Sequence, residues 1–151
     1  MNAPLPAGLQ ANLFGAAQRL YIQHGPTNLV IDADGPDRLA LFELAVDSMR
    51  DVLSGLVGEL SCLRAPWDVA HPPSGAVARR MHDACAIAGD RFVTSMAAVA
   101  GAIADHVLAA MMTGPHAADT DDTDARHDRN SGGSSPSSGP GRGSAATPRI
   151  V

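Results

Sequence analysis

The chain has 151 residues with a net charge of −5, of which 45% are hydrophobic and only 3% aromatic. This composition fits one ordinary domain whose core is built from Ala, Val, Leu and Met. All 11 basic residues are arginine, so there is no P-loop lysine or Schiff-base lysine, and no basic excess with which to bind nucleic acid.

Neither a signal peptide nor a membrane span is predicted. Residues 1–19 contain no continuous apolar stretch and no early basic residue. The apolar run 96–104 is too short to cross a bilayer, and extending it meets Asp105 and His106. We therefore expect a cytoplasmic protein without membrane contact.

Three strands are predicted at the start of the chain, over residues 9–14, 18–24 and 28–34. In the second and third strands apolar and polar residues alternate, and Gly25-Pro26 between them is a turn signal. This pattern predicts a small antiparallel meander with one buried face.

A long amphipathic helix is predicted over residues 37–63, after Asp34-Gly35-Pro36-Asp37, in which either aspartate can cap the helix. Apolar residues spaced alternately three and four apart form one stripe; they are Leu39, Phe42, Val46, Met49, Leu53, Leu56, Leu60 and Leu63. The same stripe could pair between two chains as in a coiled coil. A helical interaction module that forms a homodimer through Leu39–Leu63 is therefore the alternative reading of function.

Two shorter helices are predicted over 76–88 and 96–112. Ser74 can cap the first, which ends at Gly89, and Thr94 or Ser95 can cap the second. The class is therefore α+β, with the meander followed by one long and two shorter helices. Residues 113–151 have few large aliphatic side chains, so we expect a disordered low-complexity tail.

Several polar groups are interpreted as structural. Cys62 and Cys85 are expected to be small buried hydrophobes. We expect His82 to be a surface residue beside the core Cys85, and Asp105-His106 to lie on a solvated helix face. The acidic stretch 119–124 lacks the glycine and glutamate of a calcium loop, so no metal site is predicted.

Two features are candidate binding elements. His24 and Gly25 belong to a rigid turn, where an imidazole could face a ligand. Thr94 and Ser95 begin an Ala/Gly-rich helix, where two hydroxyls, free amides and the positive end of the dipole could receive a phosphate. A plain turn and ordinary capping explain the same residues. Catalytic residues cannot be assigned.

Four segments carry a family resemblance: RLYIQHGPTNLVIDADG (19–35), LRAPW (63–67), VARRMHDA (77–84) and GDRFVTSMAAVAGAIADHVLAAM (89–111). In this order and spacing they resemble an uncharacterised bacterial and archaeal family of the ApbE-like superfamily. Its better-known relatives are the FAD:protein FMN transferases, also called thiamine-biosynthesis lipoproteins. The resemblance covers residues 9–112, and it departs at Ser95, where the family has proline.

The resemblance implies an α+β fold and a flavin or other nucleotide ligand, FAD or FMN. His24, Gly25, Thr94 and Ser95 are candidate contacts for it on turn and helix-end geometry alone. In such transferases Mg²⁺ neutralises the pyrophosphate, but the strands and helix that carry most metal and nucleotide contacts do not follow residue 112 here. We therefore expect a partial ApbE-like domain over 9–112 that is catalytically incompetent, with its enzyme status open. Residues 113–151 are then the product of reading GC-rich DNA in the wrong frame. Alternatively, they are a natural extension of the same composition.

Overall fold

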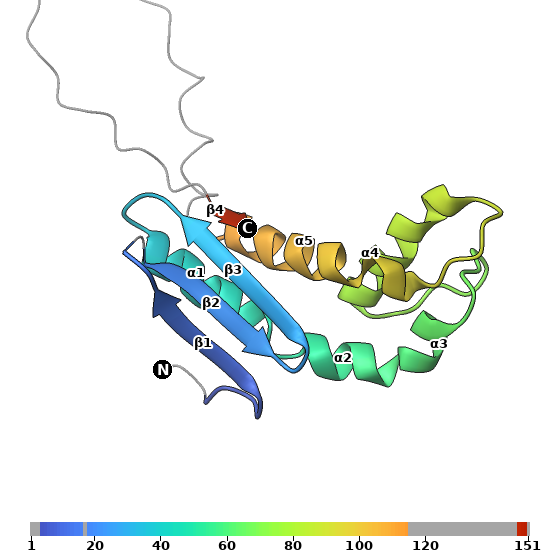
Figure 1. Cartoon of the computed structure of the whole chain (residues 1–151), viewed down its shortest axis with the longest axis horizontal. Coiled ribbons are helices and arrows are strands. Elements are labelled where there is room, and N and C mark those ends of the chain that lie inside the picture. Colours follow the sequence, from blue (N-terminus) through green and yellow to red (C-terminus); the bar gives the residue numbers. More distant parts are fainter. Residues whose placement is uncertain (1–3, 17, 115–147, 151) are drawn as a thin grey trace, which may run out of the picture.

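The structure is a computed structural model that describes residues 4–16, 18–114 and 148–150. The predicted meander is confirmed: β1 (Leu9–Phe14), β2 (Arg19–His24) and β3 (Thr27–Ala33) pair antiparallel in chain order. A fourth strand, β4 (Pro148–Ile150), pairs antiparallel with β3, which gives the sheet order β1-β2-β3-β4 (Figure 1).

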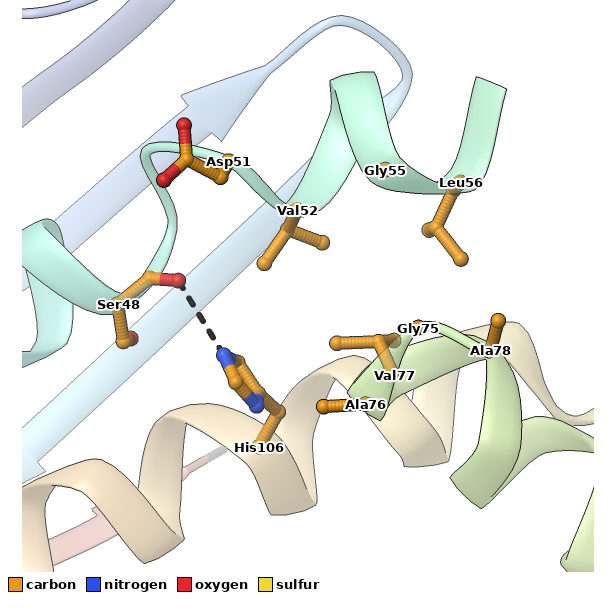
Figure 2. A pocket seen from close by; sticks show the side chains of 10 residues that line it. All are labelled: Ser48, Asp51, Val52, Gly55, Leu56, Gly75, Ala76, Val77, Ala78 and His106. Atoms are coloured by element: carbon orange, nitrogen blue, oxygen red, sulfur yellow. Dashed lines mark hydrogen bonds between the residues drawn. The ribbon is translucent and has the colours of Figure 1, made fainter. Parts of the chain in front are cut away.

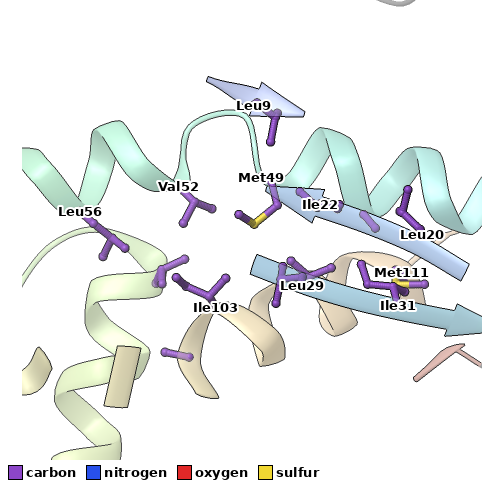
Figure 3. Close-up of a cluster of buried hydrophobic side chains, with 14 of the residues drawn as sticks. Leu9, Leu20, Ile22, Leu29, Ile31, Met49, Val52, Leu56, Ile103 and Met111 are labelled. Carbon is purple, nitrogen blue, oxygen red and sulfur yellow. The ribbon is translucent and has the colours of Figure 1, made fainter. Parts of the chain in front are cut away.

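One face of the sheet forms the core. Leu20 and Ile22 of β2 are buried, as are Leu29 and Ile31 of β3, and the residues between them are half-buried or exposed. Two helices, α1 (Arg38–Ser48) and α5 (Val99–Met112), pack beside each other and complete this core (Figures 1 and 3). This arrangement confirms the α+β class expected from the sequence. Strands with alternating apolar residues form the sheet, and helices with an apolar stripe cover its buried face.

The end of the chain was expected to be a tail without structure over 113–151. Residues 115–147 and 151, including the acidic stretch 119–124, lie outside the described residues. The expectation is corrected at Pro148–Ile150, which form β4 with Ile150 opposite Ile31. Ile150 packs against the hydrophobic core, as the inward-facing residue of a strand does.

The single long helix expected over 37–63 is wrong, because the structure divides it into three. These are α1, α2 (Val52–Gly58) and α3 (Leu60–Arg64). At the first break the amide of Met49 donates to the carbonyl of Val46, three residues back, at 3.1 Å. This tight turn leaves the carbonyl of Ser48 at a helix end, where it lies 3.3 Å from Nε2 of His106 on α5.

The predicted stripe is confirmed in part. Its buried members are Phe42, Met49, Leu56 and Leu63, but Leu39 is 60% exposed. Ala45 and Val52 are buried where Val46 and Leu53 were expected. The shift by one residue occurs on both sides of the break, since Ala45 lies in α1 and Val52 in α2.

The two shorter helices are found, and the first ends at Gly89 as expected, but no side-chain hydrogen bond caps the start of either. They are α4 (Ala76–Cys85), extended by the 3-10 turn η1 (Ala86–Ala88), and α5, preceded by the 3-10 turn η2 (Ser95–Ala98). Gly75, and not Ser74, is the N-cap of α4, and Thr94 precedes η2 without a side-chain capping bond. Because η2 intervenes, α5 begins only at Val99.

The stretch Ser95–Met112 is 18 residues long, with a mean hydropathy of 1.5, and is long and apolar enough to cross a membrane by length and composition. This is longer than the run expected from the sequence. The core helix of a globular domain has the same properties, and α5 buries Ala102, Ile103, Val107 and Met111 against the neighbouring elements. We therefore interpret it as a core helix.

The turn between β2 and β3 requires glycine. His24 pairs with Thr27 across a two-residue turn, and Gly25 has φ +57° at its first position, as a type II′ turn needs. A Cβ at this position would lie 3.1 Å from Cδ2 of Leu53 on α2. Both the backbone conformation and the close approach of α2 therefore exclude larger residues.

The substitution Gly25→Ala should lower the free energy of unfolding by about 1–3 kcal/mol, because it combines a strained φ with a contact to Leu53. Urea denaturation of the full chain measures this change. The matched control is Gly55→Ala in α2, where no heavy atom lies within 4 Å of the added Cβ. That change should raise the free energy of unfolding by about 0.5–1 kcal/mol; equal effects at both positions would contradict the assigned turn.

Candidate functional site

Trp67 anchors the loop between α3 and α4 to the rest of the helical half. Its indole Nε1 donates to the carbonyl of His82 on α4 at 2.8 Å, and its ring stacks on the His82 imidazole with centroids 5.2 Å apart. Its backbone amide donates to the carbonyl of Val93 at 2.8 Å. Trp67 is thus tied both to α4 and to the segment that leads into η2.

Trp67 borders a small cavity of about 180 Å³, which we call the Trp67 hollow. The residues that line it are Cys62, Ala65, Pro66, Trp67, Asp68, His71, His82 and Ser95. His82 and Ser95 are 5% and 4% exposed, respectively. Within the described part of the chain, no hydrogen bond is made by the His82 ring nitrogens or the Ser95 hydroxyl. Both groups are therefore available to a small polar ligand.

Asp68 and His71 form a pair at the mouth of this hollow. Oδ2 of Asp68 lies 2.7 Å from Nδ1 of His71, and Oδ1 accepts from the amide of Ala70 at 2.9 Å. The Ala70 amide and the His71 side chain hold the pKa of Asp68 below its usual range, so the carboxylate is ionised at neutral pH. Because an ionised carboxylate only accepts hydrogen bonds, Nδ1 of His71 carries the proton and Nε2 is free in the neutral ring.

Cys62 brings a thiol to the same hollow. Its Sγ lies 3.7 Å from the carbonyl oxygen of His71, and the residue is exposed. The expectation that Cys62 is buried is therefore wrong, because α3 turns this side toward the loop that follows it. Cys85 is buried as expected, and its Sγ lies 3.5 Å from the carbonyl oxygen of Thr94.

Trp67 also borders a more open cavity of about 430 Å³, which we call the Phe92 hollow and which shares Pro66, Trp67 and Asp68 with the Trp67 hollow. The residues that line it are Pro66, Trp67, Asp68, Val69, Gly89, Asp90, Arg91, Phe92 and Val93. Phe92 is 82% exposed and Val69 74% exposed. This hollow presents aromatic surface beside an arginine, whereas the Trp67 hollow presents small polar groups.

A third cavity, of about 340 Å³, lies between the break after α1 and the start of α4 (Figure 2). His106 was expected on a solvated face, but it is half-buried here and its Nε2 lies 3.3 Å from the Ser48 carbonyl oxygen. The Asp51 carboxylate points away from His106 (Figure 2). The rest of the lining is largely apolar, so His106 is better explained as the partner of a helix end.

The residues predicted for binding are not brought together. His24 is 5% exposed, with its Nδ1 unpartnered among the described residues, and Gly25 packs against α2. Neither lines the hollow that contains Ser95. The Thr94 carbonyl, not its hydroxyl, accepts from the amide of Ala97 at 3.0 Å. Of the four candidates, only Ser95 faces a cavity with other polar groups.

Most of this site was not predicted from the sequence. Trp67 was named only within the segment 63–67 that carries the resemblance, Asp68 and His71 were not candidates, and His82 was expected on the surface, although stacking on Trp67 buries it. One local signal was present, since Asp68 and His71 are three residues apart in a short Pro-bounded loop. No group of three or more side chains suited to a metal ion occurs in the described ranges.

The loop that carries the site is fixed by Glu59. Its two carboxylate oxygens accept from the amides of Ser74 and Gly75 at 2.7 and 2.6 Å. These amides lie at the start of α4, where backbone N–H groups lack partners within the helix and the dipole favours an anion. The capping role expected for the Ser74 hydroxyl is therefore performed by a carboxylate from between α2 and α3.

The profile of a protein family described as AbpE bacteria matches residues 11–120 of the chain. The match includes every helix described here and all residues of both hollows beside Trp67. Neither a curated protein nor a solved structure matches the chain.

The substitution Glu59→Ala should lower the free energy of unfolding by about 2 kcal/mol, because it leaves two amides without their charged acceptor. Trp67 should then report a more solvated ring as a red-shifted emission. Thermal and urea unfolding measure the first effect, and fluorescence measures the second. The matched control is Glu43→Ala at the only other glutamate, which is exposed on α1 and should change stability by less than about 0.5 kcal/mol. A similar loss in both variants would refute the anchoring role.

Proposed function

The chain belongs to the AbpE bacteria family, and from this premise we propose that it binds a flavin or a related nucleotide beside Trp67. FMN or FAD is the ligand implied by the sequence resemblance to the ApbE-like superfamily. What supports a binding site here is the placement of Trp67, Arg91 and Phe92 around one open hollow. The proposal concerns binding by this chain.

The observation that carries the proposal is the aromatic surface of the Phe92 hollow. Phe92 is 82% exposed and Val69, in the lining of the same cavity, is 74% exposed; contiguous exposed apolar surface in a cavity is typical of a ligand-binding groove. An isoalloxazine ring is flat and aromatic, and aromatic rings gain about 0.5–1.5 kcal/mol from stacking beyond the area they bury. The volume of about 430 Å³ lies within the range of small-molecule sites.

Polar groups around the aromatic surface fit a phosphorylated ligand. The Arg91 guanidinium can hold a phosphate through two parallel hydrogen bonds. Trp67 already uses its Nε1–H on His82, so only its ring face remains for a ligand. The Ser95 hydroxyl and the His82 imidazole supply donors or acceptors to any ligand group that reaches the Trp67 hollow. A flavin would thus stack in the Phe92 hollow and place its phosphate near Arg91.

The helical interaction module stays a prediction with less support. Four of the eight stripe residues are buried in the core of the same chain. Leu39, at 60% exposure, lies instead in a groove with Leu5 and Leu13. A homodimer through the stripe would therefore have to compete with the sheet for the same side chains. The cytoplasmic location also stays a prediction.

Titration of the full chain with FMN tests the flavin proposal through intrinsic fluorescence, because Trp67 is the only tryptophan. Binding beside it should quench its emission to saturation. Phe92→Leu should weaken FMN binding about tenfold through lost stacking. Arg91→Ala should also weaken it and should affect riboflavin, which lacks the phosphate, much less.

The matched control is Phe14→Leu, which removes the other partly exposed phenylalanine, on β1, at 44% exposure. This variant should bind FMN as the unsubstituted chain does. Equal affinities of the Phe92→Leu variant and the unsubstituted chain would contradict the assigned surface, and an absence of saturable quenching would contradict flavin binding beside Trp67.

A further inference from the structure

We propose that Cys62, His71 and Asp68 act as a nucleophile, a general base and an orienting carboxylate, so that the Cys62 thiol accepts a small acyl group from an ester or thioester. This activity is distinct from flavin binding, since it uses the Trp67 hollow and not the Phe92 hollow, although Pro66, Trp67 and Asp68 line both. The three residues lie in α3 and the loop that follows it, and all line the Trp67 hollow.

The carboxylate orients the base. Asp68 Oδ2 lies 2.7 Å from His71 Nδ1, and the Ala70 amide fixes the other oxygen of Asp68 at 2.9 Å. The imidazole is therefore held with its proton on Nδ1 and its lone pair on Nε2, the form that a general base requires. The His71 side chain is 81% exposed, so Nε2 can both receive a proton and release it to solvent or to a leaving group.

The thiol lies beside the backbone of the same residue. Cys62 Sγ is 3.7 Å from the carbonyl oxygen of His71, and no disulfide engages it. Both side chains line one cavity of about 180 Å³. The proposed reaction requires the exposed imidazole to turn its Nε2 toward Sγ when a substrate is bound, as a nucleophile and its base often approach only in the reacting complex.

The same cavity is lined by further polar side chains whose atoms are accessible from it, since the fully buried side-chain atoms without a hydrogen bond among the described residues are Nε of Arg19 and Nδ1 of His24. The His82 imidazole is 5% exposed and lines the hollow, and its ring nitrogens make no hydrogen bond within the described residues. The Ser95 hydroxyl, at 4% exposure, lines it as well. Buried polar groups in native proteins normally have partners. An acyl oxygen that enters the hollow would supply the acceptor that the Ser95 hydroxyl and an Nε2–H or Nδ1–H of His82 lack.

The reaction balances without a further reagent. The S–H bond of Cys62 breaks, its proton passes to Nε2 of His71, and the sulfur electron pair forms a bond to the acyl carbon. The bond from that carbon to the leaving oxygen or sulfur then breaks, and the leaving atom keeps the electron pair. The proton on His71 passes to the leaving group. The products are an acyl-Cys62 thioester and an alcohol or thiol, and the size of the hollow favours a short acyl chain.

The test is to treat the full chain with 4-nitrophenyl acetate, follow the release of nitrophenolate, and locate the acetyl group by mass spectrometry of peptides. We expect acetylation of Cys62, faster than in the same chain unfolded in urea. Cys85 is the matched control, because Cys85→Ser should leave the reaction unchanged, whereas Cys62→Ala should abolish the acetyl label. Acetylation mainly at Cys85, or no faster at Cys62 than in the unfolded chain, would overturn the proposal.

Two variants test the roles of the other residues. His71→Ala should slow acetylation of Cys62 about 100-fold, with partial rescue by added imidazole. Asp68→Asn, which can still accept from Ala70, should slow the reaction less. Both positions are exposed, and unchanged thermal unfolding would confirm an intact fold. An unchanged rate and pH profile in His71→Ala would overturn the proposed base.

The two proposals fail separately. Cys62→Ala should still show FMN quenching of Trp67, and Phe92→Leu should still be acetylated. Loss of both activities in either variant, with thermal unfolding unchanged, would overturn the assignment of the acyl site to a separate cavity.

Discussion

The Glu59 carboxylate is the contact on which the helical half of the molecule depends. It joins the bend between α2 and α3 to the first amides of α4, and so closes the intervening loop at its far end. The fit is close, since a Cβ on Gly75 would lie 2.7 Å from Oε1 of Glu59. With this end fixed, Trp67 can stack on His82, and the bridge between Pro66 and Thr94 aligns the loop with the segment before η2. An anion supplied by the chain itself thus takes the position at a helix start that a bound ligand takes in other proteins.

Trp67 lines two chemically different cavities, which also share Pro66 and Asp68. In one, Phe92 and Arg91 offer stacking surface and positive charge. In the other, a thiol, two imidazoles, a carboxylate and a hydroxyl surround a cavity of less than half the volume. The ring is tied at its Nε1 and at its backbone amide, so it acts as a fixed wall rather than a mobile lid. Because Asp68 lines both cavities, a ligand in one of them lies within reach of a carboxylate of the other.

The strands and the existence of helices could be predicted from the sequence, because alternation in β2 and β3 and three–four spacing after Arg38 are local patterns. The break after Ser48 could not, because no proline or glycine marks it and its freed carbonyl is satisfied by His106, more than 50 residues away. The candidate site was harder to predict from the sequence than this break. Ser95 was selected as a helix cap, yet it matters through its burial, and its neighbours Cys62, Trp67 and His82 come from separate segments that only tertiary packing joins. Asp68 and His71 were visible as neighbours but not as a pair.

The division of the helix also avoids a mismatch between the length of the strands and the length of one continuous helix. A strand of six residues, such as β2, spans about 20 Å, whereas one straight helix from Arg38 to Arg64 would extend about 40 Å. Half of such a rod would project beyond the sheet with its leucines facing water. By dividing it, the chain keeps α1 over the strands and gives α2 and α3 a different partner in α4 and η2. The meander thus needs no further strands to cover the second half, and a small sheet can support a helical region larger than itself.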